Sequence, residues 1–261
     1  MTYKILFLDI DGTILKPDHT YTESTKDAIS QLKEQDIEVF LATGRPLHEV
    51  KDLAKELDVD SLIGYNGAFA IYQNETIINE PMDAGTVRKF LDIARENKHE
   101  MVCYTTEKNY FTSLSNPVVK HFIDTFDLKY NEVFSQDIIE NILGATLMNL
   151  DPSESSLYKI EANLHLSHVN VKGVEHSYDI IRKNVNKGEA VKNVLNRLGL
   201  QKEQAIAFGD GMNDKEMLQE VGEGFAMANG APELLEYAKH KADPVTESGI
   251  FNGLKKLGLV K

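Results

Sequence analysis

The chain has one cysteine, fewer basic than acidic residues and no long hydrophobic run. Cys103 is the only cysteine among 261 residues, so no internal disulfide can form, and a reducing compartment fits best. We therefore expect a cytoplasmic protein in which Cys103 is a small buried apolar residue. Lysine and arginine number 28 against 41 acidic residues, and the resulting net charge of −13 argues against a nucleic-acid binder.

No apolar stretch is long enough to cross a bilayer. The first residues, MTYKILFLDIDGT, hold an apolar run, but Asp9 and Asp11 interrupt it and no small-residue cleavage site follows. This pattern is typical of a strand and not of a signal peptide. There is no internal repeat and no low-complexity tract, and the sequence gives no sign of an obligate protein partner.

Short apolar runs recur along the chain, with helical patterns between them. The runs lie at residues 4–8, 37–42, 62–65, 205–208 and 224–228. Runs of this length without alternation suit strands that are buried on both faces of a parallel sheet. Apolar residues spaced by three and four, such as Val191, Val194 and Leu198, predict the helices that connect them. The alternation predicts an α/β fold with a doubly wound, parallel, Rossmann-like sheet.

The middle of the chain departs from this rhythm. It predicts a helix at 84–97, short strands at 101–106, 109–114 and 142–150, helices opened by Pro117 and Pro152, and a strand at 169–183. This order is typical of a separate α+β module. We therefore expect a core formed by residues 1–81 and 184–261, with residues 82–183 inserted as a second domain. The two would be connected near 81–84 and 182–186, where hinge motion is expected.

The first strand ends in Asp9-Ile10-Asp11-Gly12-Thr13, at the edge of the sheet where ligands bind in open α/β folds. Asp9 and Asp11 are two residues apart, so an extended chain would place both carboxylates on one face. Two carboxylates held together repel each other, and a divalent cation would relieve the repulsion. The same residues also suit an ordinary Asp-Gly turn.

Two further strand ends carry similar chemistry. Thr43 and Gly44 follow the second strand, where a hydroxyl and free N–H groups at a helix start could bind an anion. Asp210, Asn213 and Asp214 follow the fourth strand, and such oxygen ligands suit magnesium better than zinc. A threonine cap and a polar loop are the alternatives for these two segments taken singly. Because all three strand ends agree, the sequence predicts a site for phosphate and Mg²⁺.

Lys187 opens the helix before the fourth strand, an unfavourable place for a cation in the field of the helix dipole. A solvated surface lysine is the default expectation. Near several carboxylates and a phosphate, however, its charge would stabilise the bound anion.

These segments together resemble the four motifs of the haloacid dehalogenase-like hydrolases, and within that family the Cof-type phosphatases. The matching segments are DIDGT at 9–13, ATGR at 42–45, NKGEA at 186–190 and GDGMND at 209–214, in the family's order and spacing. Asn66-Gly67-Ala68, after the third strand, is similar to a further Cof-type signature. The resemblance covers essentially the whole chain.

The resemblance implies a role for each motif residue. Asp9 would be the nucleophile, Asp11 the general acid and base, and Asp9, Asp11 and Asp210 the Mg²⁺ ligands, with Asp214 supporting the metal site. Ile10, Thr43, Gly44, Lys187 and Asn213 would bind the phosphoryl group. The inserted module would be a type II cap that selects the substrate.

Several side chains are weaker candidates for contact with a substrate. Arg45, Asn66, Arg182, His176 and Tyr178 are the candidates, and for Arg182 we expect surface solvation instead. His176, Tyr178 and Lys172 lie on the predicted last strand of the module, where alternation turns about half the side chains away. His165 and His168 have no evident third metal ligand, so we do not expect a metal there.

The reading favoured by the residues is a phosphatase that acts on a small phosphorylated metabolite, such as a sugar phosphate or a phosphorylated cofactor, through an aspartyl-phosphate on Asp9. Having Asp11 two residues after the nucleophile favours hydrolysis, because it can protonate the leaving oxygen and then activate water. A phosphomutase or phosphotransferase on the same core, or a sensor that binds a phosphorylated ligand without turnover, are the alternatives.

Overall fold

The computed structural model describes residues 2–169 and 171–261, which form two compact units. The first unit consists of Met1–Arg45, Asp52–Ile78 and Asn186–Lys261, and the second consists of Pro46–Lys51 and Asn79–Val185. Each unit has its own sheet and its own buried core. The short segment Pro46–Lys51 groups with the second unit, although it directly follows a strand of the first.

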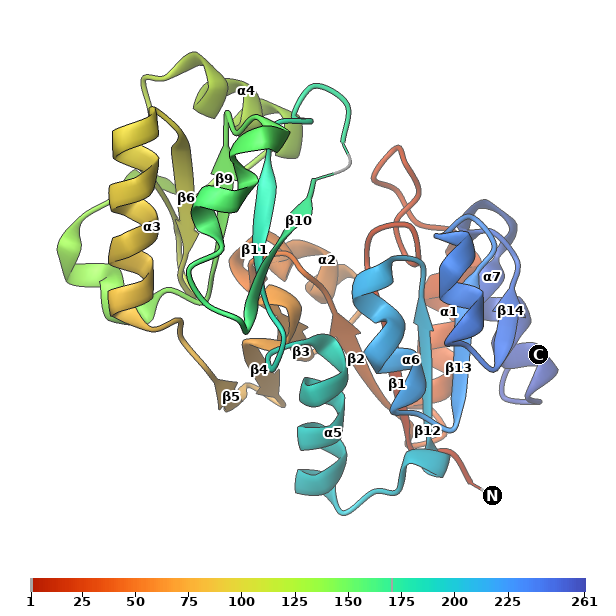
Figure 1. Ribbon diagram of the computed structural model, residues 1–261. Helices are drawn as coiled ribbons and strands as arrows, with labels where there is room; N and C mark the ends of the chain where they lie inside the picture. Colours follow the sequence, from red (N-terminus) through yellow and green to blue (C-terminus); the bar gives the residue numbers. More distant parts are fainter. Residues whose placement is uncertain (1, 170) are drawn as a thin grey trace. The chain divides into compact units, whose positions relative to one another are not determined.

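The first unit is built on an eight-stranded, mainly parallel sheet (Figure 1). Its strands, in spatial order, are β14 (His240–Ala242), β13 (Glu223–Met227), β12 (Ala205–Gly209), β1 (Ile5–Leu8), β2 (Glu38–Ala42), β3 (Ser61–Gly64), β4 (Phe69–Tyr72) and β5 (Glu75–Asn79). The strands from β14 to β3 are parallel, and β4 turns back antiparallel to β3. The register pairs Leu8 with Phe208 on one side and with Leu41 on the other, so β1 lies at the centre.

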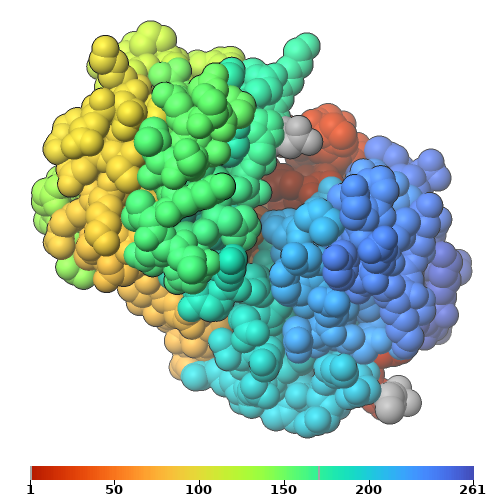
Figure 2. Space-filling model, viewed as in Figure 1, coloured from red at the N-terminus to blue at the C-terminus, as the bar shows by residue number. Residues whose placement is uncertain are grey.

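Helices cover both faces of this sheet. Its strands are apolar on both faces, so both faces must be shielded from water. The helices of this unit are α1 (Glu23–Lys33), α2 (Lys51–Glu56), α5 (Lys187–Leu198), α6 (Lys215–Gln219) and α7 (Gly249–Lys256). Ile5 and Phe7 pack in one cluster with Val191 and Val194 of α5, whereas α1 and α7 pack against each other on the other face. Figure 2 shows the side chains of α5 and α6 concealing the strands from this side.

The second unit has a six-stranded mixed sheet. Its strands, in spatial order, are β10 (Leu164–His168), β11 (Tyr178–Arg182), β9 (Gly144–Met148), β6 (Glu100–Tyr104), β7 (Asn109–Phe111) and β8 (Asn131–Val133). Helix α3 (Ala84–Asn97) buries Val87 and Phe90 on one face, and α4 (Pro117–Phe126) buries Val119 and Phe122 on the other. Because side chains alternate along β6, Met101 and Cys103 pack in the core beside α3, whereas Val102 packs in the core beside α4.

The predicted fold class, an α/β core with an inserted α+β module, is confirmed by these two sheets. The helix predicted to open at Pro152 is present as a 3-10 helix, Pro152–Tyr158, and a 3-10 turn, Leu47–Glu49, precedes α2. The last strand predicted in the module is wrong in extent. Of the strand expected at 169–183 only β11 forms, so Lys172 and His176 lie in the loop before it, and Asn170 lies outside the described residues.

No helix within residues 2–169 and 171–261 is both long enough and apolar enough to pass through a membrane. A cytoplasmic location stays a prediction.

Candidate active site

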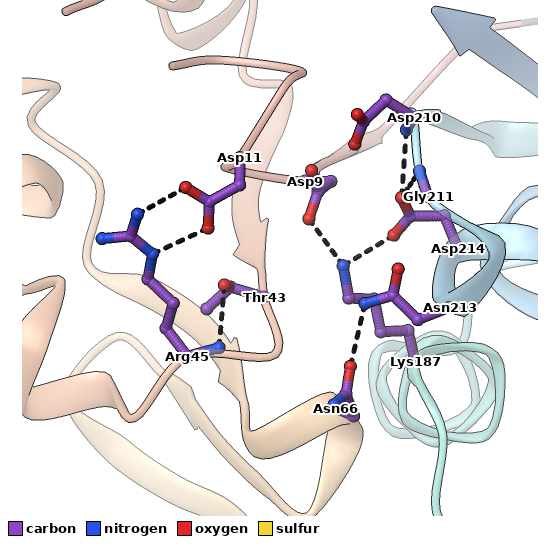
Figure 3. A network of polar contacts seen from close by, with 10 residues as sticks. All are labelled: Asp9, Asp11, Thr43, Arg45, Asn66, Lys187, Asp210, Gly211, Asn213 and Asp214. Atoms are coloured by element: carbon purple, nitrogen blue, oxygen red, sulfur yellow. Dashed lines mark hydrogen bonds and ion pairs between the residues drawn. The ribbon is translucent and has the colours of Figure 1, made fainter. Parts of the chain in front are cut away.

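The candidate site lies where three neighbouring parallel strands of the first unit end. β1 leads into Asp9, β2 into Thr43 and β12 into Asp210, and β1 lies between the other two. Parallel pairing brings these carboxyl ends to one edge of the sheet. The polar side chains from the three strand ends therefore gather at that edge (Figure 3).

Lys187 joins the first and fourth motifs. Its ammonium group donates to Asp9 Oδ1 at 2.6 Å and to Asp214 Oδ1 at 2.6 Å, and its side chain is fully buried. Lys187 is the first residue of α5, whose start is capped by the side chain of Asn186 accepting from the Glu189 N–H at 2.9 Å. The default of a solvated surface lysine is therefore wrong, because this lysine is an internal counter-ion.

Asp214 is fixed by hydrogen bonds on both of its carboxylate oxygens. Oδ2 accepts the main-chain N–H groups of Asp210 and Gly211, each at 3.0 Å, while Oδ1 accepts from Lys187. A Cβ on Gly209 would come within 2.6 Å of the Asp214 side chain, so the strand end must be a glycine for Asp214 to lie there. Asp214 thus holds the loop that carries Asp210.

The site has more negative charge than its own residues balance. Asp9, Asp210 and Asp214 have carboxylate oxygens within 4.8 Å of one another, and Lys187 is the ammonium group that contacts the cluster. Burial, and then repulsion from Asp214, raise the pKa of Asp9 well above its usual range and that of Asp210 to about 7. Burial opposes the charge of Lys187, but the two carboxylates that it contacts outweigh this and raise its pKa.

The donor set suits a hard divalent cation. Asp9 Oδ2 is buried and accepts no hydrogen bond from any described residue, and Asp210 lies beside it. Oxygen ligands without histidine or cysteine are those that Mg²⁺ prefers. A cation bound by Asp9 and Asp210 would offset the surplus charge of the cluster, so the residues present fit a magnesium site.

Asp11 points away from this cluster and pairs with Arg45 (Figure 3). The guanidinium Nε donates to Asp11 Oδ2 at 2.7 Å, and Nη2 donates to Oδ1 at 2.5 Å. Between the pair and the cluster lies Thr43, whose hydroxyl oxygen accepts the Arg45 N–H at 3.0 Å. Because that oxygen is used as an acceptor, the Thr43 O–H remains able to donate to an anion.

A strained turn after β3 brings Asn66 to the site. Tyr65 and Asn66 have φ values of 54° and 53°, in the left-handed region that costs energy for residues other than glycine, and Gly67 follows at 102°. Asn66 Oδ1 accepts from Asn213 Nδ2 at 3.0 Å, and a Cβ on Gly44 would lie 3.0 Å from the same oxygen. The turn therefore connects the third strand end to the second and the fourth.

The family comparison agrees with the four motifs. The family model of the haloacid dehalogenase-like hydrolases matches residues 6–254, nearly the whole chain. The chain belongs to the haloacid dehalogenase-like hydrolases. Within that family it is a Cof-type phosphatase, that is, a phosphoric monoester hydrolase.

Several relatives and solved structures of this family align along the full length of the phosphatase. Protein YkrA of Bacillus subtilis (strain 168), named only as a candidate phosphatase, is 34% identical over 100% of both chains. The 5-amino-6-(5-phospho-D-ribitylamino)uracil phosphatase YitU of the same organism is 28% identical, with 97% of this chain and 96% of YitU covered. A solved structure from Geobacillus kaustophilus HTA426 has a TM-score of 0.90 at 29% identity, covering 99% and 100% of the two chains.

The candidate side chains of the second unit of this phosphatase differ in what they contact. Arg182 is not solvated as expected: its guanidinium donates to the main-chain carbonyls of Glu80, Pro81 and Leu143, at 2.8 to 3.2 Å. Tyr178 packs in the core on the α3 side of the sheet, whereas His176 is exposed. Arg182 and Tyr178 thus have structural partners within their own unit.

Sequence reasoning missed the turn Asn229-Gly230-Ala231 of the phosphatase. Asn229 Nδ2 donates to the Gly12 carbonyl at 2.8 Å, and the Ala231 N–H donates to the Asp210 carbonyl at 2.8 Å. This turn follows β13, next to β12, so it supports the loops of the first and fourth motifs from a fifth strand end. The Asn-Gly pair directly after an apolar run was the signal that could have indicated it.

Proposed function

We propose that this phosphatase hydrolyses a small phosphorylated metabolite through a covalent aspartyl-phosphate on Asp9. The observation that carries the proposal is the state of Asp9: one carboxylate oxygen is held by Lys187, and the other is buried and unpaired beside Asp210. A carboxylate fixed by one oxygen presents the other in a set direction, as a nucleophile requires.

The first half of the reaction transfers the phosphoryl group. Asp9 Oδ2 attacks phosphorus, the bond to the ester oxygen breaks, and the carboxyl proton of Asp11 goes to the departing oxygen. The repulsion between an anionic nucleophile and an anionic phosphate is the main obstacle. Lys187 offsets it, and Thr43 and Asn213 supply donors from neighbouring strand ends.

The second half hydrolyses the intermediate. Asp11, now a carboxylate, takes a proton from a water molecule, whose oxygen attacks the phosphorus and releases Asp9. Inorganic phosphate leaves, and Asp11 is protonated as at the start. Of the other proposed phosphate contacts, Ile10 has a buried side chain and can offer only its main-chain N–H, and Gly44 can likewise offer only main-chain groups.

Mg²⁺ would be held by Asp9, Asp210 and the main-chain carbonyl of Asp11, with Asp214 supporting the site. It would supply positive charge that neutralises the phosphoryl oxygens. Without it, the three carboxylates, of which Asp9 and Asp214 are buried, face a phosphate dianion with one lysine between them. We therefore expect turnover to require the cation.

The substrate class is a small phosphorylated metabolite. Two relatives support this, because their names give small phosphorylated compounds as substrates: YitU of Bacillus subtilis and the HMP-PP phosphatase of Escherichia coli O6:H1, which is 27% identical over 91% of this chain and 88% of its own length. Sugar phosphates and phosphorylated cofactors are therefore the first compounds to test. The side chains of the second unit would select among them.

The test is turnover of p-nitrophenyl phosphate with Mg²⁺. We expect Asp9→Asn to lower kcat by at least about a thousandfold, because the amide is no nucleophile. Asp124→Asn, on the exposed face of α4, is the matched control and should turn over like the wild type. Wild-type rates in Asp9→Asn, or in the wild type with excess chelator, would refute the mechanism.

A further inference from the structure

Arg45 holds the carboxylate of Asp11 by a two-pronged contact. Both Asp11 oxygens accept from one planar guanidinium, at 2.7 Å and 2.5 Å, a geometry that fixes orientation as well as distance. The two residues follow β1 and β2, which pair in parallel, so both main chains are anchored to the same sheet.

The main chain of Arg45 is itself fixed on both sides. Its N–H donates to Thr43 Oγ1 at 3.0 Å, and its carbonyl accepts the Tyr65 N–H at 3.2 Å. Thr43 is buried at the site, so the guanidinium extends from a rigid base next to the candidate phosphate-binding residues. A side chain held in this way can set the position of its partner.

Asp11 needs such a partner because of the charges next to it. Asp9, two residues earlier, contacts Lys187 and belongs to the carboxylate cluster. A free carboxylate at position 11 would be drawn toward the same ammonium group and toward any cation held there. Arg45 gives Asp11 a competing positive partner on the opposite side (Figure 3).

We propose that Arg45 is a positioning residue that keeps the Asp11 carboxylate apart from the Asp9–Lys187–Asp214 cluster, so that Asp11 is placed to act as the base that activates water while Asp9 serves as nucleophile. The inference rests on the proposed function, since it assigns a role relative to Asp11. Arg45 acts through Asp11 and not by binding the substrate. The pair is partly exposed, so its loss should hardly change stability.

The decisive measurement is a double-mutant cycle on p-nitrophenyl phosphate with Mg²⁺. Arg45→Gln should lower kcat by about tenfold or more with little change in KM, and should cost nothing further in the Asp11→Asn background. Arg45→Lys keeps the charge without the planar fork and should recover part of the loss. Arg88→Gln, an exposed arginine of α3, is the control and should match the wild type.

Pre-steady-state kinetics give a second measurement. Nitrophenolate leaves without much help from an acid, so a misplaced Asp11 slows mainly the hydrolysis of the aspartyl-phosphate. Arg45→Gln and Asp11→Asn should therefore both release nitrophenolate in a larger initial burst than the wild type does, followed by slow turnover.

The outcomes separate the two proposals. If Arg45→Gln raises KM at unchanged kcat, or costs as much in the Asp11→Asn background as alone, Arg45 binds substrate and the inference is wrong. If Asp11→Asn shows the burst and Arg45→Gln behaves as the wild type, the inference again fails while the mechanism stands. Undiminished turnover in Asp9→Asn would instead overturn the proposed function itself.

Discussion

At Gly12 the backbone leaves no room for a side chain. Its φ is +80°, and a Cβ there would lie 2.1 Å from Asp210 Oδ2. Alanine at this position would displace the Asp210 carboxylate from the proposed metal site. We expect Gly12→Ala to lower kcat on p-nitrophenyl phosphate by about a hundredfold or more, because a misplacement of about 1 Å can cost that much.

Gly199 provides the matched control for this prediction. It also has a positive φ, +66°, but a Cβ there would meet nothing within 4 Å. Gly199→Ala should therefore show the cost of the backbone conformation alone, about 1 kcal/mol in the free energy of unfolding, with unchanged kcat. Equal activity in the two variants would contradict the steric argument.

The sequence could predict which residue types gather at the site but not how their side chains pair. Asp9, Thr43, Lys187 and Asp210 follow from strand ends and motif spacing, because a parallel sheet brings its carboxyl ends together. The Arg45–Asp11 pair and the support from Asn229 depend on rotamers and on the spacing between neighbouring loops. The Asn-Gly pair can indicate the turn that carries Asn229, but no local sequence pattern gives these side-chain contacts.

Among the elements, the segment Pro46–Lys51 is the least expected. Within the second unit, His48 Nε2 lies 3.0 Å from Asn109 Oδ1, and Asn109 Nδ2 donates to Glu49 Oε1 at 2.6 Å. From the sequence we expected a helix to start directly after Thr43 and Gly44. The observed 3-10 turn instead buries His48 beside the first residue of β7.

The buried His48 predicts a pH dependence of stability. Burial lowers its pKa, so between the folded and the unfolded pKa the unfolded chain binds more protons. Its contribution is therefore complete above the unfolded value of about 6.5 and is lost as the pH falls toward the folded pKa. Urea unfolding at pH 7.5 and 5.5, about one unit above and below the unfolded value, should show a smaller loss of stability in His48→Gln than in the wild type.

Glutamine keeps a polar group that can face Asn109 but does not titrate, so the comparison isolates the proton. His19, which is exposed, gives the control variant His19→Gln, whose pH dependence should equal that of the wild type. An identical loss in His48→Gln and the wild type would show that His48 does not contribute.

The elements that the sequence predicted well are those with long, regular patterns. Helix α3 was expected at 84–97 and lies at Ala84–Asn97, because its apolar face repeats over four turns and Asp83 caps its start. The strands β4, β5, β8, β10 and β14 were not expected separately. Each of them is only partly buried and depends on pairing with its neighbours, whereas β1 and β12 are buried along their whole length and stand out as apolar runs.

For the whole molecule, the candidate site is a source of instability as well as of function. The chain is already acidic, at −13, and the fold holds Asp9, Asp210 and Asp214 with their oxygens within 4.8 Å. Holding like charges together in a buried site raises the free energy of the folded state. In the unfolded chain the carboxylates are far apart, so that state has no such cost. A bound cation would recover that cost, because it binds the folded state and not the unfolded one.

Thermal unfolding of Asp210→Asn tests this trade-off. In excess chelator, removing one of the three carboxylates should raise the Tm by a few degrees, since about 1 kcal/mol shifts the Tm of a chain of this size by roughly 2–4 °C. Mg²⁺ should raise the Tm of the wild type and of the surface control Asp124→Asn, but not that of Asp210→Asn, which should also be inactive. If Asp210→Asn melts below the wild type in chelator and still responds to Mg²⁺, then Asp210 is neither a repelling charge nor a ligand, and the stability of the site has another origin.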